Sequence, residues 1–471
     1  MAENIREIVL DTLLEMERSG QYSNLLIRSV LDKYNYLDVK DKAFFKRVTE
    51  GTVERQQELD YYLDSFSTVP VKKMKPLIRC LMRMSVYQLL YMEAVPDSAV
   101  CNEACKLAEA RKFRNLKGFV NGVLRNISRN KERLPLPDRK REPVKYLSVY
   151  YSMPEWLITL WLEEYGEEMT EKILGGLLAI HPVTIRFGKK TDAETEQQIC
   201  DEIRAAGVEM KQVRYLPGVY TLEHLDFIPS LPGFAEGIWT VQDVSSALAV
   251  EAAEIREEDL VLDACAAPGG KSLLAAELAA RVISRDVSED KVELIRENIE
   301  RMQAWNVTPE VWDATCFDET MENRADVVLL DVPCSGLGIL GKKRDIKYHV
   351  NPEGLVGLTE LQKKIVETCS RYVKPGGTLV YSTCTIHRAE NEDMVRFLVR
   401  ELGFEPVSLE PVLPELLLEE KKAVSHIQQK TDRNPTGLSV EEQNACIQLL
   451  PGYMETDGFF IARFRKPTSA M

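Results

Sequence analysis

Apolar runs of strand length alternate with helix-like segments over most of the C-terminal half of the chain. The strand-like runs are "DLVLDAC", "RVISRDV", "ADVVLLDV" and "GGTLVYSTC", and a segment with helical apolar spacing follows each of them. Strands that alternate with helices of this length are typical of a doubly wound parallel sheet. We therefore predict a Rossmann-like α/β domain over residues 241–467, with "ACIQLL" and "GFFIARF" as an antiparallel hairpin at its edge.

The N-terminal part of the chain has a different pattern. From residue 3 to about residue 130, apolar residues recur at intervals of three and four, which predicts an all-α bundle domain over residues 1–135. A linker, "LPLPDRKREP", follows, and residues 147–240 mix helical segments with short strands such as "VTIRFG". This mixture predicts a small α+β module between the bundle and the Rossmann-like domain.

Composition excludes several classes of protein. Hydrophobic content of 45% and charged content of 28% are ordinary for globular proteins and exclude disordered or fibrous chains. The N-terminus "MAENIREIVLDTLLEM" lacks the features of a signal peptide, and no apolar run is long enough to span a bilayer. We therefore predict a cytoplasmic protein without membrane contact, whose ten cysteines are reduced. The cysteines form no CxxC pair and no zinc spacing, so we predict no metal.

The stretch "DACAAPGGK", residues 263–271, joins the first strand of the alternation to its helix. Ligands of doubly wound sheets bind at the carboxyl ends of the strands. Gly269 and Gly270 permit a tight turn, and the helix that begins there presents free N–H groups. The spacing differs from the GxGxxG pattern of pyrophosphate-binding turns, so the turn suits a nucleoside ligand without a diphosphate.

Four carboxylates follow four successive strands, namely Asp263, Asp286, Asp313 and Asp331. Asp286 lies about 20 residues after the turn, where an acid accepts the protons of ribose hydroxyls. Asp313 is placed to accept the exocyclic amine of an adenine. A carboxylate at a strand end is often only a helix cap, but four of them predict an acidic rim. Such a rim suits a ligand with a positive centre and no phosphates, and we predict S-adenosylmethionine.

Two cysteines follow two of these strand-like runs. "LDVPCSGLG" places Cys334 after a proline, and "LVYSTCTIH" places Cys384 at the end of the next strand. The usual role of a cysteine is that of a small buried hydrophobic residue. A thiolate is also an effective nucleophile, and both cysteines are expected at the same edge of the sheet.

Three stretches together resemble a known family. "DACAAPGGK", "LDVPCSGLG" and "YSTCT" are similar to the cofactor loop, the Pro-Cys motif and the Thr-Cys motif of RNA 5-methylcytosine methyltransferases. "SVYQLLYMEAVPDSAVCNEACKLA" and "KGFVNGVLRN" resemble the NusB-like RNA-binding domain of the bacterial 16S ribosomal RNA member. The resemblance covers nearly the whole chain. It implies S-adenosylmethionine-dependent methylation of cytosine C5, with small-subunit ribosomal RNA as the partner of a monomer.

The resemblance also implies roles for the site residues. Cys384 is the nucleophile that adds to cytosine C6, and Cys334 assists product release, whereas DNA cytosine methyltransferases use a Pro-Cys nucleophile. Asp331 is expected to donate a proton at N3 of the base, and Lys271 either supports the thiol and Asp331 or faces solvent. The residues expected to bind the cofactor are Cys265, Ala266, Ala267, Pro268, Gly269, Gly270, Lys271, Asp286, Asp313 and Asp331.

Basic residues concentrate in two segments although the net charge of the chain is −14. In residues 111–146 Lys and Arg greatly outnumber Asp and Glu, which indicates either an RNA-binding surface or a solvated helix face with a linker. "GKKRDIKY", residues 341–348, is the second candidate for contact with the RNA backbone. Arg344 stands there where members of the family usually have a proline.

Three other readings remain open at this point. They are a nicotinamide-dependent oxidoreductase, a non-catalytic RNA-binding or assembly protein, and a 5-methylcytosine methyltransferase that acts on another RNA. The sequence does not identify the cytosine, nor whether naked RNA or an assembling particle is the substrate. Residues 411–450 are expected to form an insertion-like loop without an assigned role.

Overall fold

The computed structural model describes residues 4–179, 181–225, 227–430 and 436–468. The chain divides into two compact units. The helical unit consists of Met1–Leu174 and Leu340–His349, and the sheet unit consists of Gly175–Ile339 and Val350–Met471. None of the described helices is long and apolar enough to cross a membrane.

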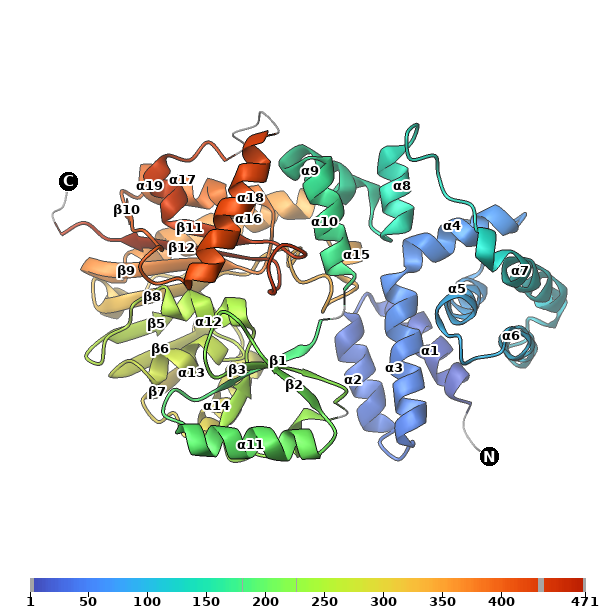
Figure 1. The fold of residues 1–471 in the computed structure, drawn as a ribbon, viewed down its shortest axis with the longest axis horizontal. Coiled ribbons are helices and arrows are strands. Elements are labelled where there is room, and N and C mark those ends of the chain that lie inside the picture. The colour runs from blue at the N-terminus through green and yellow to red at the C-terminus, as the bar shows by residue number, and fades with distance from the viewer. Residues whose placement is uncertain (1–3, 180, 226, 431–435, 469–471) are drawn as a thin grey trace. The chain divides into compact units, whose positions relative to one another are not determined.

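The helical unit is built around α5 (Pro76–Tyr91), which is buried along most of its length. Helices α1, α3, α4, α6 and α7 all pack against α5, which confirms the all-α domain predicted for the N-terminal part (Figure 1). The other elements of the unit are α1 (Ile5–Ser19), α2 (Ser23–Lys33), α3 (Val39–Glu54), α4 (Gln56–Phe66), η1 (Val71–Lys73), α6 (Asp97–Ala110), η2 (Arg114–Leu116), α7 (Lys117–Asn130), η3 (Lys131–Arg133), α8 (Pro143–Tyr150), α9 (Glu155–Tyr165), α15 (Ile346–His349) and α10 (Glu167–Leu177), whose last turn belongs to the sheet unit.

A small antiparallel sheet begins the sheet unit, with the strand order β2-β3-β1-β4. Its elements are β1 (Val183–Phe187), α11 (Ala193–Ala205), β2 (Glu209–Gln212), β3 (Val219–Glu223), η4 (Ile228–Ser230) and β4 (Trp239–Val241). Strand β1 coincides with the predicted strand "VTIRFG". The segment predicted as one module, residues 147–240, is divided, because α8 and α9 belong to the helical unit.

The large sheet has the strand order β10-β12-β9-β8-β5-β6-β7, and β11 pairs with β12. Pairing is parallel from β9 to β7 and antiparallel at β12, so the doubly wound sheet and its antiparallel edge are confirmed. Its strands are β5 (Leu260–Asp263), β6 (Arg281–Asp286), β7 (Val307–Val311), β8 (Ala325–Asp331), β9 (Val373–Thr383), β10 (Glu405–Pro406), β11 (Cys446–Leu449) and β12 (Phe459–Arg465).

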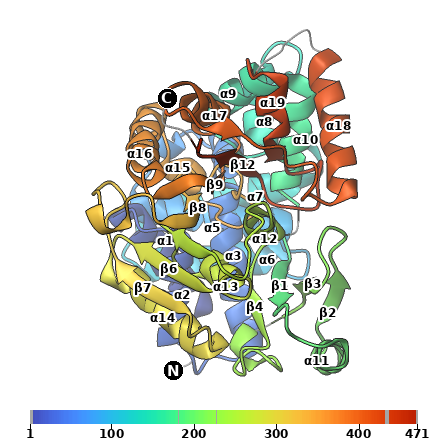
Figure 2. The ribbon, with the colours of Figure 1, turned by 90° about the vertical axis from the view of Figure 1, so that its left-hand side faces the viewer.

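Helices cover both faces of this sheet (Figures 1 and 2). They are α12 (Val244–Glu251), α13 (Gly270–Ala276), α14 (Glu289–Met302), α16 (Pro352–Ser370) and α17 (Glu392–Arg400), with the short η5 (Glu319–Met321) and η6 (Arg388–Glu390) between elements. Alternate residues of neighbouring strands, such as Val328, Leu330 and Leu379, form one core with α16 and α17. This alternation is the period-two pattern of a strand, and it leaves the strand ends to carry the polar residues.

The expectation of a loop over residues 411–450 is wrong for most of the segment. The structure places α18 (Glu415–Lys430) and α19 (Val440–Asn444) there, while residues 431–435 lie outside the described part of the chain. Leu417 and Val424 of α18 are buried. Spaced seven residues apart, they lie on one face of the helix, and this apolar face explains why the segment folds against the unit.

Candidate active site

The loops that follow β8 and β9 bring Cys334 and Cys384 together. The two strands are parallel neighbours in which Asp331 lies opposite Ser382, so both chains leave the sheet at the same level. The Sγ atoms of the cysteines are 3.2 Å apart, and the backbone N–H of Cys384 donates to Sγ of Cys334 over 3.3 Å. Both cysteines are free thiols and are partly exposed. The structure thus places the two predicted cysteines at one point.

The environment of Cys334 disfavours its ionisation. The hydrogen bond with Cys384 and the burial of the sulfur raise the pKa of Cys334 well above its ordinary value. A thiolate is the nucleophilic form of cysteine. Cys334 therefore remains a thiol at neutral pH while its partner shares that hydrogen bond.

Lys271 connects the cofactor loop to Asp331. Its Nζ donates to Oδ2 of Asp331 over 2.6 Å, and Oδ1 of Asp331 accepts from Oγ of Ser382 over 2.9 Å. Burial opposes the charged form of Lys271, but the carboxylates of Asp331 and Asp263 outweigh burial and raise the pKa of the lysine. The alternative in which Lys271 faces solvent is therefore wrong, because this side chain is buried and orients Asp331.

The stretch 263–271 forms a tight turn around a carboxylate. Gly269 has a φ of 100°, a backbone conformation that favours glycine, and it precedes α13. Oδ2 of Asp286 accepts from the backbone N–H of Ala267 over 2.9 Å, and Oδ1 accepts from Val287 N–H over 2.8 Å and from Nζ of Lys291 over 3.0 Å. Asp286 thereby fixes the turn at the carboxyl end of β6.

Asp313 lies two residues beyond β7 and keeps one oxygen available. Its Oδ1 accepts from both the N–H and the Oγ1 of Thr315 over 2.8 Å, and these bonds lower the pKa of Asp313. Within the described part of the chain, Oδ2 has no hydrogen-bond partner. An ionised carboxylate with one free oxygen is suited to accept an amine of a ligand.

Arg285, which sequence reasoning missed, stabilises the segment that carries Asp313. The guanidinium of Arg285 donates to Glu310 over 2.8 Å and to Asp318 over 2.6 Å, and its centre lies 4.8 Å from the ring centroid of Trp312. These partners flank Asp313 in the chain. The only signal in the sequence is an arginine inside a run that otherwise has the composition of a buried strand.

Asp263 does not belong to the predicted acidic rim. It is completely buried, its Oδ2 accepts from Oγ of Ser272 over 2.7 Å, and its Oδ1 has no partner among the described residues. The following residue, Ala264, is still bonded to β8 through Leu329. The chain therefore leaves the sheet only beyond Asp263, and this carboxylate lies beneath the turn.

Two more residues that the sequence did not indicate, Glu390 and Asn391, are fully buried next to the cysteine loops. Glu390 accepts from the backbone N–H of Ser335, and Asn391 contacts the residues on either side of Cys384. In the sequence they stand in "RAENED" just before a helix, where polar residues are ordinary.

The segment "GKKRDIKY" is mostly occupied by contacts within the helical unit. Arg344 forms ion pairs with Glu50 and Glu54 of α3, and Nζ of Lys347 donates to the carbonyls of Glu54 and Ser152 over 2.7 and 2.6 Å. Burial lowers the pKa of Lys347 to about 7. The prediction that this segment binds RNA is therefore wrong for Lys347, which is buried, while Arg344 is paired with two acids and Lys343 is exposed.

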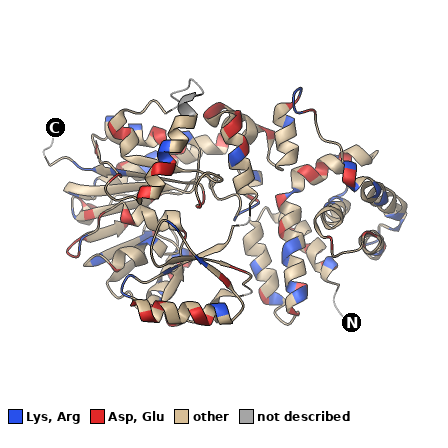
Figure 3. Ribbon diagram, viewed as in Figure 1, with Lys and Arg blue, Asp and Glu red and all other residues tan. Residues whose placement is uncertain are grey.

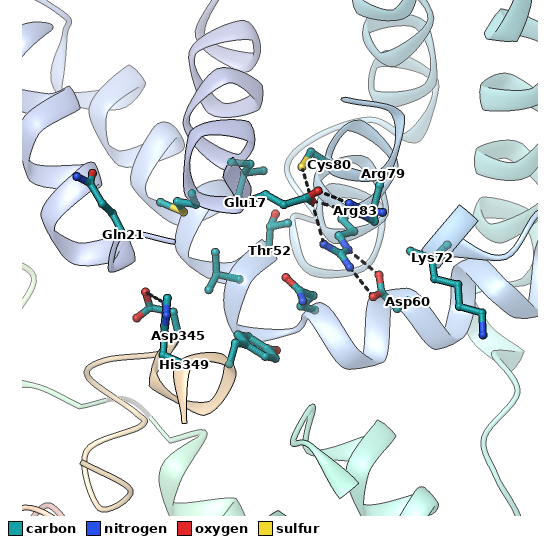
Figure 4. A pocket seen from close by; sticks show the side chains of 16 residues that line it. Glu17, Gln21, Thr52, Asp60, Lys72, Arg79, Cys80, Arg83, Asp345 and His349 are labelled. Atoms are coloured by element: carbon teal, nitrogen blue, oxygen red, sulfur yellow. Dashed lines mark hydrogen bonds and ion pairs between the residues drawn. The ribbon is translucent and has the colours of Figure 1, made fainter. Parts of the chain in front are cut away.

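Asp345 of this segment and His349, which follows it, line a cavity of about 530 Å³ in the helical unit (Figure 4). Arg83 donates to both carboxylate oxygens of Asp60 over 2.6 Å, and Arg79 pairs with Glu17. These acids neutralise the arginines, so the cavity does not have the charge of an anion site.

The exposed face of α7 keeps part of the predicted basic character (Figure 3). Arg125 contacts only the neutral Asn121, and the exposed Arg129 has no ion-pair partner among the described residues. A Cβ atom added at Gly122 would meet nothing within 4 Å. Several other basic residues of the stretch have acidic partners, as Arg111 has in Glu7 and Asp11. Within the stretch, α7 is therefore the helix that presents two arginines without acidic partners among the described residues.

Comparison with known proteins shows which families the chain resembles. The model of the family "16S rRNA methyltransferase RsmB/F" matches residues 250–465, and that of the NusB family matches residues 3–129. The chain is 36% identical to the probable ribosomal RNA small subunit methyltransferase B of Bacillus subtilis, over 98% of this chain and 99% of that protein.

Solved structures share the fold. PH0851 has a TM-score of 0.76 at 23% identity and covers 99% of this chain and 100% of its own. NSun6 from Pyrococcus horikoshii, crystallised with SFG, has a TM-score of 0.53 at 20% identity and covers 67% of this chain and 99% of its own. The resemblance inferred from the three motifs is confirmed.

The burial of Asp263 predicts how the free energy of unfolding depends on pH. Burial raises the pKa of Asp263 to about 6, against about 3.9 in an unfolded chain, so the folded protein binds this proton more tightly. The contribution of Asp263 to the free energy of unfolding should therefore decline as pH rises from about 4 to about 6. Asp263→Asn, which does not titrate, should gain about 3 kcal/mol on wild type between pH 4 and pH 6. Urea unfolding across pH 4–8 measures this difference. Asp290→Asn, at an exposed position, is the control. A difference in the free energy of unfolding between Asp263→Asn and wild type that does not change with pH would contradict the prediction.

Proposed function

Because the chain belongs to the RsmB/F family of 16S rRNA methyltransferases, we propose that it methylates C5 of a cytosine in 16S rRNA through a covalent adduct between Cys384 and C6 of the base. S-adenosylmethionine is its cofactor. The observation that carries the proposal is the pair of thiols 3.2 Å apart beside the Lys271–Asp331 ion pair. A non-catalytic RNA-binding protein would have no need for this arrangement.

Cytosine C5 becomes nucleophilic only after a group has added to C6, and a thiolate is suited to that addition. The raised pKa of Cys334 keeps its proton on the sulfur, so Cys384 is the better candidate for attack. Cys384 also lies near the buried ammonium of Lys271, whose pKa the thiolate helps to raise. A cation of this kind stabilises a thiolate.

Addition of the thiolate places negative charge on the pyrimidine, and a proton donated at N3 neutralises it. Asp331 is the group for this role, with the Lys271 ammonium 2.6 Å from its Oδ2 as the neighbouring proton source. Ser382 holds the other oxygen at 2.9 Å, so the carboxyl group cannot rotate freely. Two hydrogen bonds thus fix the orientation of the Asp331 carboxyl group.

Product release requires loss of the proton at C5. When the proton leaves, its bonding electrons restore the C5–C6 double bond and the C6–S bond breaks, which returns Cys384 as a thiolate. In the adduct the Cys384 sulfur is bonded to carbon and no longer shares the hydrogen bond that contributes most to the raised pKa of Cys334. Cys334 can then release its proton to solvent and, as a thiolate, accept the C5 proton, which is the role in release that the resemblance implies.

The cofactor would be held at the carboxyl ends of β5, β6 and β7, and it supplies the methyl group for C5. The turn 265–271 offers close backbone approach at Gly269, Asp286 would accept from the ribose hydroxyls, and Oδ2 of Asp313 would accept the adenine amine. Asp286 already accepts three hydrogen bonds, so its orientation is set before the ligand binds.

The RNA would contact the face of α7 defined by Gly118, Gly122, Arg125 and Arg129. Cationic side chains on this face can bind phosphates. The open space above Gly118 and Gly122 allows an RNA backbone to approach the helix closely. Glycine in an exposed helix interior costs about 1 kcal/mol relative to alanine. The glycines of this face therefore fit a role in binding rather than in the stability of the helix.

The roles of the cysteines lead to opposite predictions. Cys384→Ala should form no covalent adduct and no 5-methylcytosine, because the addition step is lost. Cys334→Ala should add to the base and transfer the methyl group, then remain attached to the RNA. A denaturing gel of each variant with 16S rRNA and S-adenosylmethionine, and mass spectrometric mapping of 5-methylcytosine, measure both outcomes. A stable adduct in Cys384→Ala would reverse the assignment, and full activity of both variants would disprove the mechanism.

Cofactor binding can be tested at Asp286. Asp286→Ala removes buried acceptors and should weaken S-adenosylmethionine binding by about 1–3 kcal/mol in calorimetry. Asp192→Ala, which removes the N-cap of α11, should leave the affinity unchanged. Equal affinity in Asp286→Ala and wild type would exclude Asp286 from the cofactor site.

The α7 face predicts a change in the salt dependence of RNA binding. Neutralising Arg125, Arg129 and Lys131 together should weaken binding and reduce the slope of log K against log salt by about 2, because Arg125 and Arg129 lie on the proposed face, whereas Lys131 of η3 pairs with Asp97. Neutralising the exposed Lys33, Lys40 and Lys46 of the same unit is the control for total charge. An unchanged slope in the α7 variant would show that this face contacts solvent and does not bind RNA phosphates.

A further inference from the structure

We infer that two adjacent buried residues, Glu390 and Asn391, are positioning residues that hold the two cysteine loops separately, Glu390 that of Cys334 and Asn391 that of Cys384. The inference rests on the proposed function for the meaning of each cysteine. It assigns to one turn of the chain, at the end of η6 and the start of α17, control over two different steps of the reaction.

Glu390 holds the Pro-Cys loop through three acceptor contacts. Its Oε2 accepts from the backbone N–H of Ser335 over 2.8 Å and from Nε2 of Gln362 over 2.9 Å, and its Oε1 accepts from Oγ of Ser335 over 2.5 Å. Nε2 of Gln362 also donates to the carbonyl of Pro333 over 3.0 Å. The residues before and after Cys334 are thus both linked to this carboxylate.

Asn391 holds the turn of Cys384 in the same manner. Its Oδ1 accepts from Oγ1 of Thr383 over 2.6 Å, and its Nδ2 donates to the carbonyl of Thr385 over 3.0 Å. Gln448 of β11 accepts a second hydrogen bond from Nδ2 over 2.7 Å. The amide therefore binds both neighbours of Cys384 and ties them to the edge of the sheet.

The chemistry of each side chain matches its partners. Glu390, Asn391, Thr383 and Thr385 are all fully buried, and a buried carboxylate is costly unless hydrogen bonds satisfy it. Glu390 accepts all three of its side-chain hydrogen bonds. An amide in its place would have to donate to Oγ of Ser335 and so reverse that contact. Asn391 faces a donor on one side and acceptors on the other. Oγ of Ser335 lies 2.8 Å from Oγ1 of Thr385, and this contact joins the two halves of the network.

The separate attachments predict separate defects. Loss of the Glu390 contacts releases the loop of Cys334, so attack and methyl transfer continue while elimination slows and the covalent adduct accumulates. Loss of the Asn391 contacts releases the turn of the nucleophile, so formation of the adduct slows. A residue that only stabilised the fold would lower adduct and product in parallel.

The test uses the full chain with 16S rRNA and S-adenosylmethionine. Glu390→Gln should lower steady-state turnover about tenfold, and the fraction of enzyme in a denaturation-resistant RNA adduct should rise above that of wild type. Asn391→Asp should slow single-turnover methyl transfer about tenfold and lower the adduct fraction. Ser335→Ala, which removes one hydroxyl, should shift the adduct in the same direction as Glu390→Gln and keeps the test valid if that variant does not fold.

Two matched controls separate positioning from stability. Glu442→Gln alters another buried carboxylate that accepts from a serine N–H, that of Ser439 over 2.7 Å. Asn306→Asp alters an amide that donates to the carbonyls of Ala276 and Ala279. Both controls should leave the ratio of adduct to product at the wild-type value, and thermal unfolding should confirm that all variants are folded at the assay temperature.

The outcomes distinguish this inference from the proposed function. If Cys334→Ala accumulates adduct but Glu390→Gln and Ser335→Ala do not, only the inference is wrong. If Cys334→Ala forms no adduct, the proposed roles of the cysteines are wrong. Parallel loss of adduct and product in both the Glu390 and Asn391 variants would show that the two residues are merely structural.

Discussion

The parallel pairing of β8 with β9 is the constraint on which the active site depends. Asp331 lies opposite Ser382 in this register, and the hydrogen bond between their side chains joins the two strand ends. Side chains alternate between the faces of a sheet, so a slip by one residue would turn Asp331 or Ser382 to the opposite face. Because the register holds, each strand ends at the same level, and the loops that carry Cys334 and Cys384 begin side by side.

Much of the material beneath these loops is polar, which is unusual for the core of a sheet. Asp263, Lys271 and Glu390 are all buried, and each has an ionisable side chain. Buried charges are tolerated where partners satisfy them, as Asp331 does for Lys271 and Ser335 does for Glu390. The unpaired Oδ1 of Asp263 is the exception. Such departures from the rules of a stable core are expected at functional sites.

The sequence was sufficient for the features that depend on local pattern. Alternating strands and helices predicted the sheet, and each strand end predicted where a polar residue would emerge, which is why Cys334, Cys384, Asp286 and Asp331 could be assigned to one edge. The depth of Asp263 could not be predicted, because it depends on how far the chain remains bonded to β8 beyond the strand. Glu390 could not be recognised either, since its partner Ser335 is 55 residues away in the sequence.

The segment that follows the Pro-Cys loop shows a further limit of sequence reasoning and a property of the fold. Its basic residues suggested RNA, but a charge pattern does not reveal whether a side chain is exposed. Lys347 is buried and donates to the last carbonyl of α3, that of Glu54, where the helix dipole favours a cation. Leu340–His349 thus belongs to the helical unit, although it is continuous in the chain with the loop of Cys334.

This loop is therefore anchored at both ends by buried polar side chains. Glu390 holds Ser335 within the sheet unit, and Lys347 holds the chain twelve residues later within the helical unit. Residues that such hydrogen bonds order on folding lose less conformational entropy when a substrate orders them. Each unit thus orders one end of the chain segment that leads from Cys334 to Lys347.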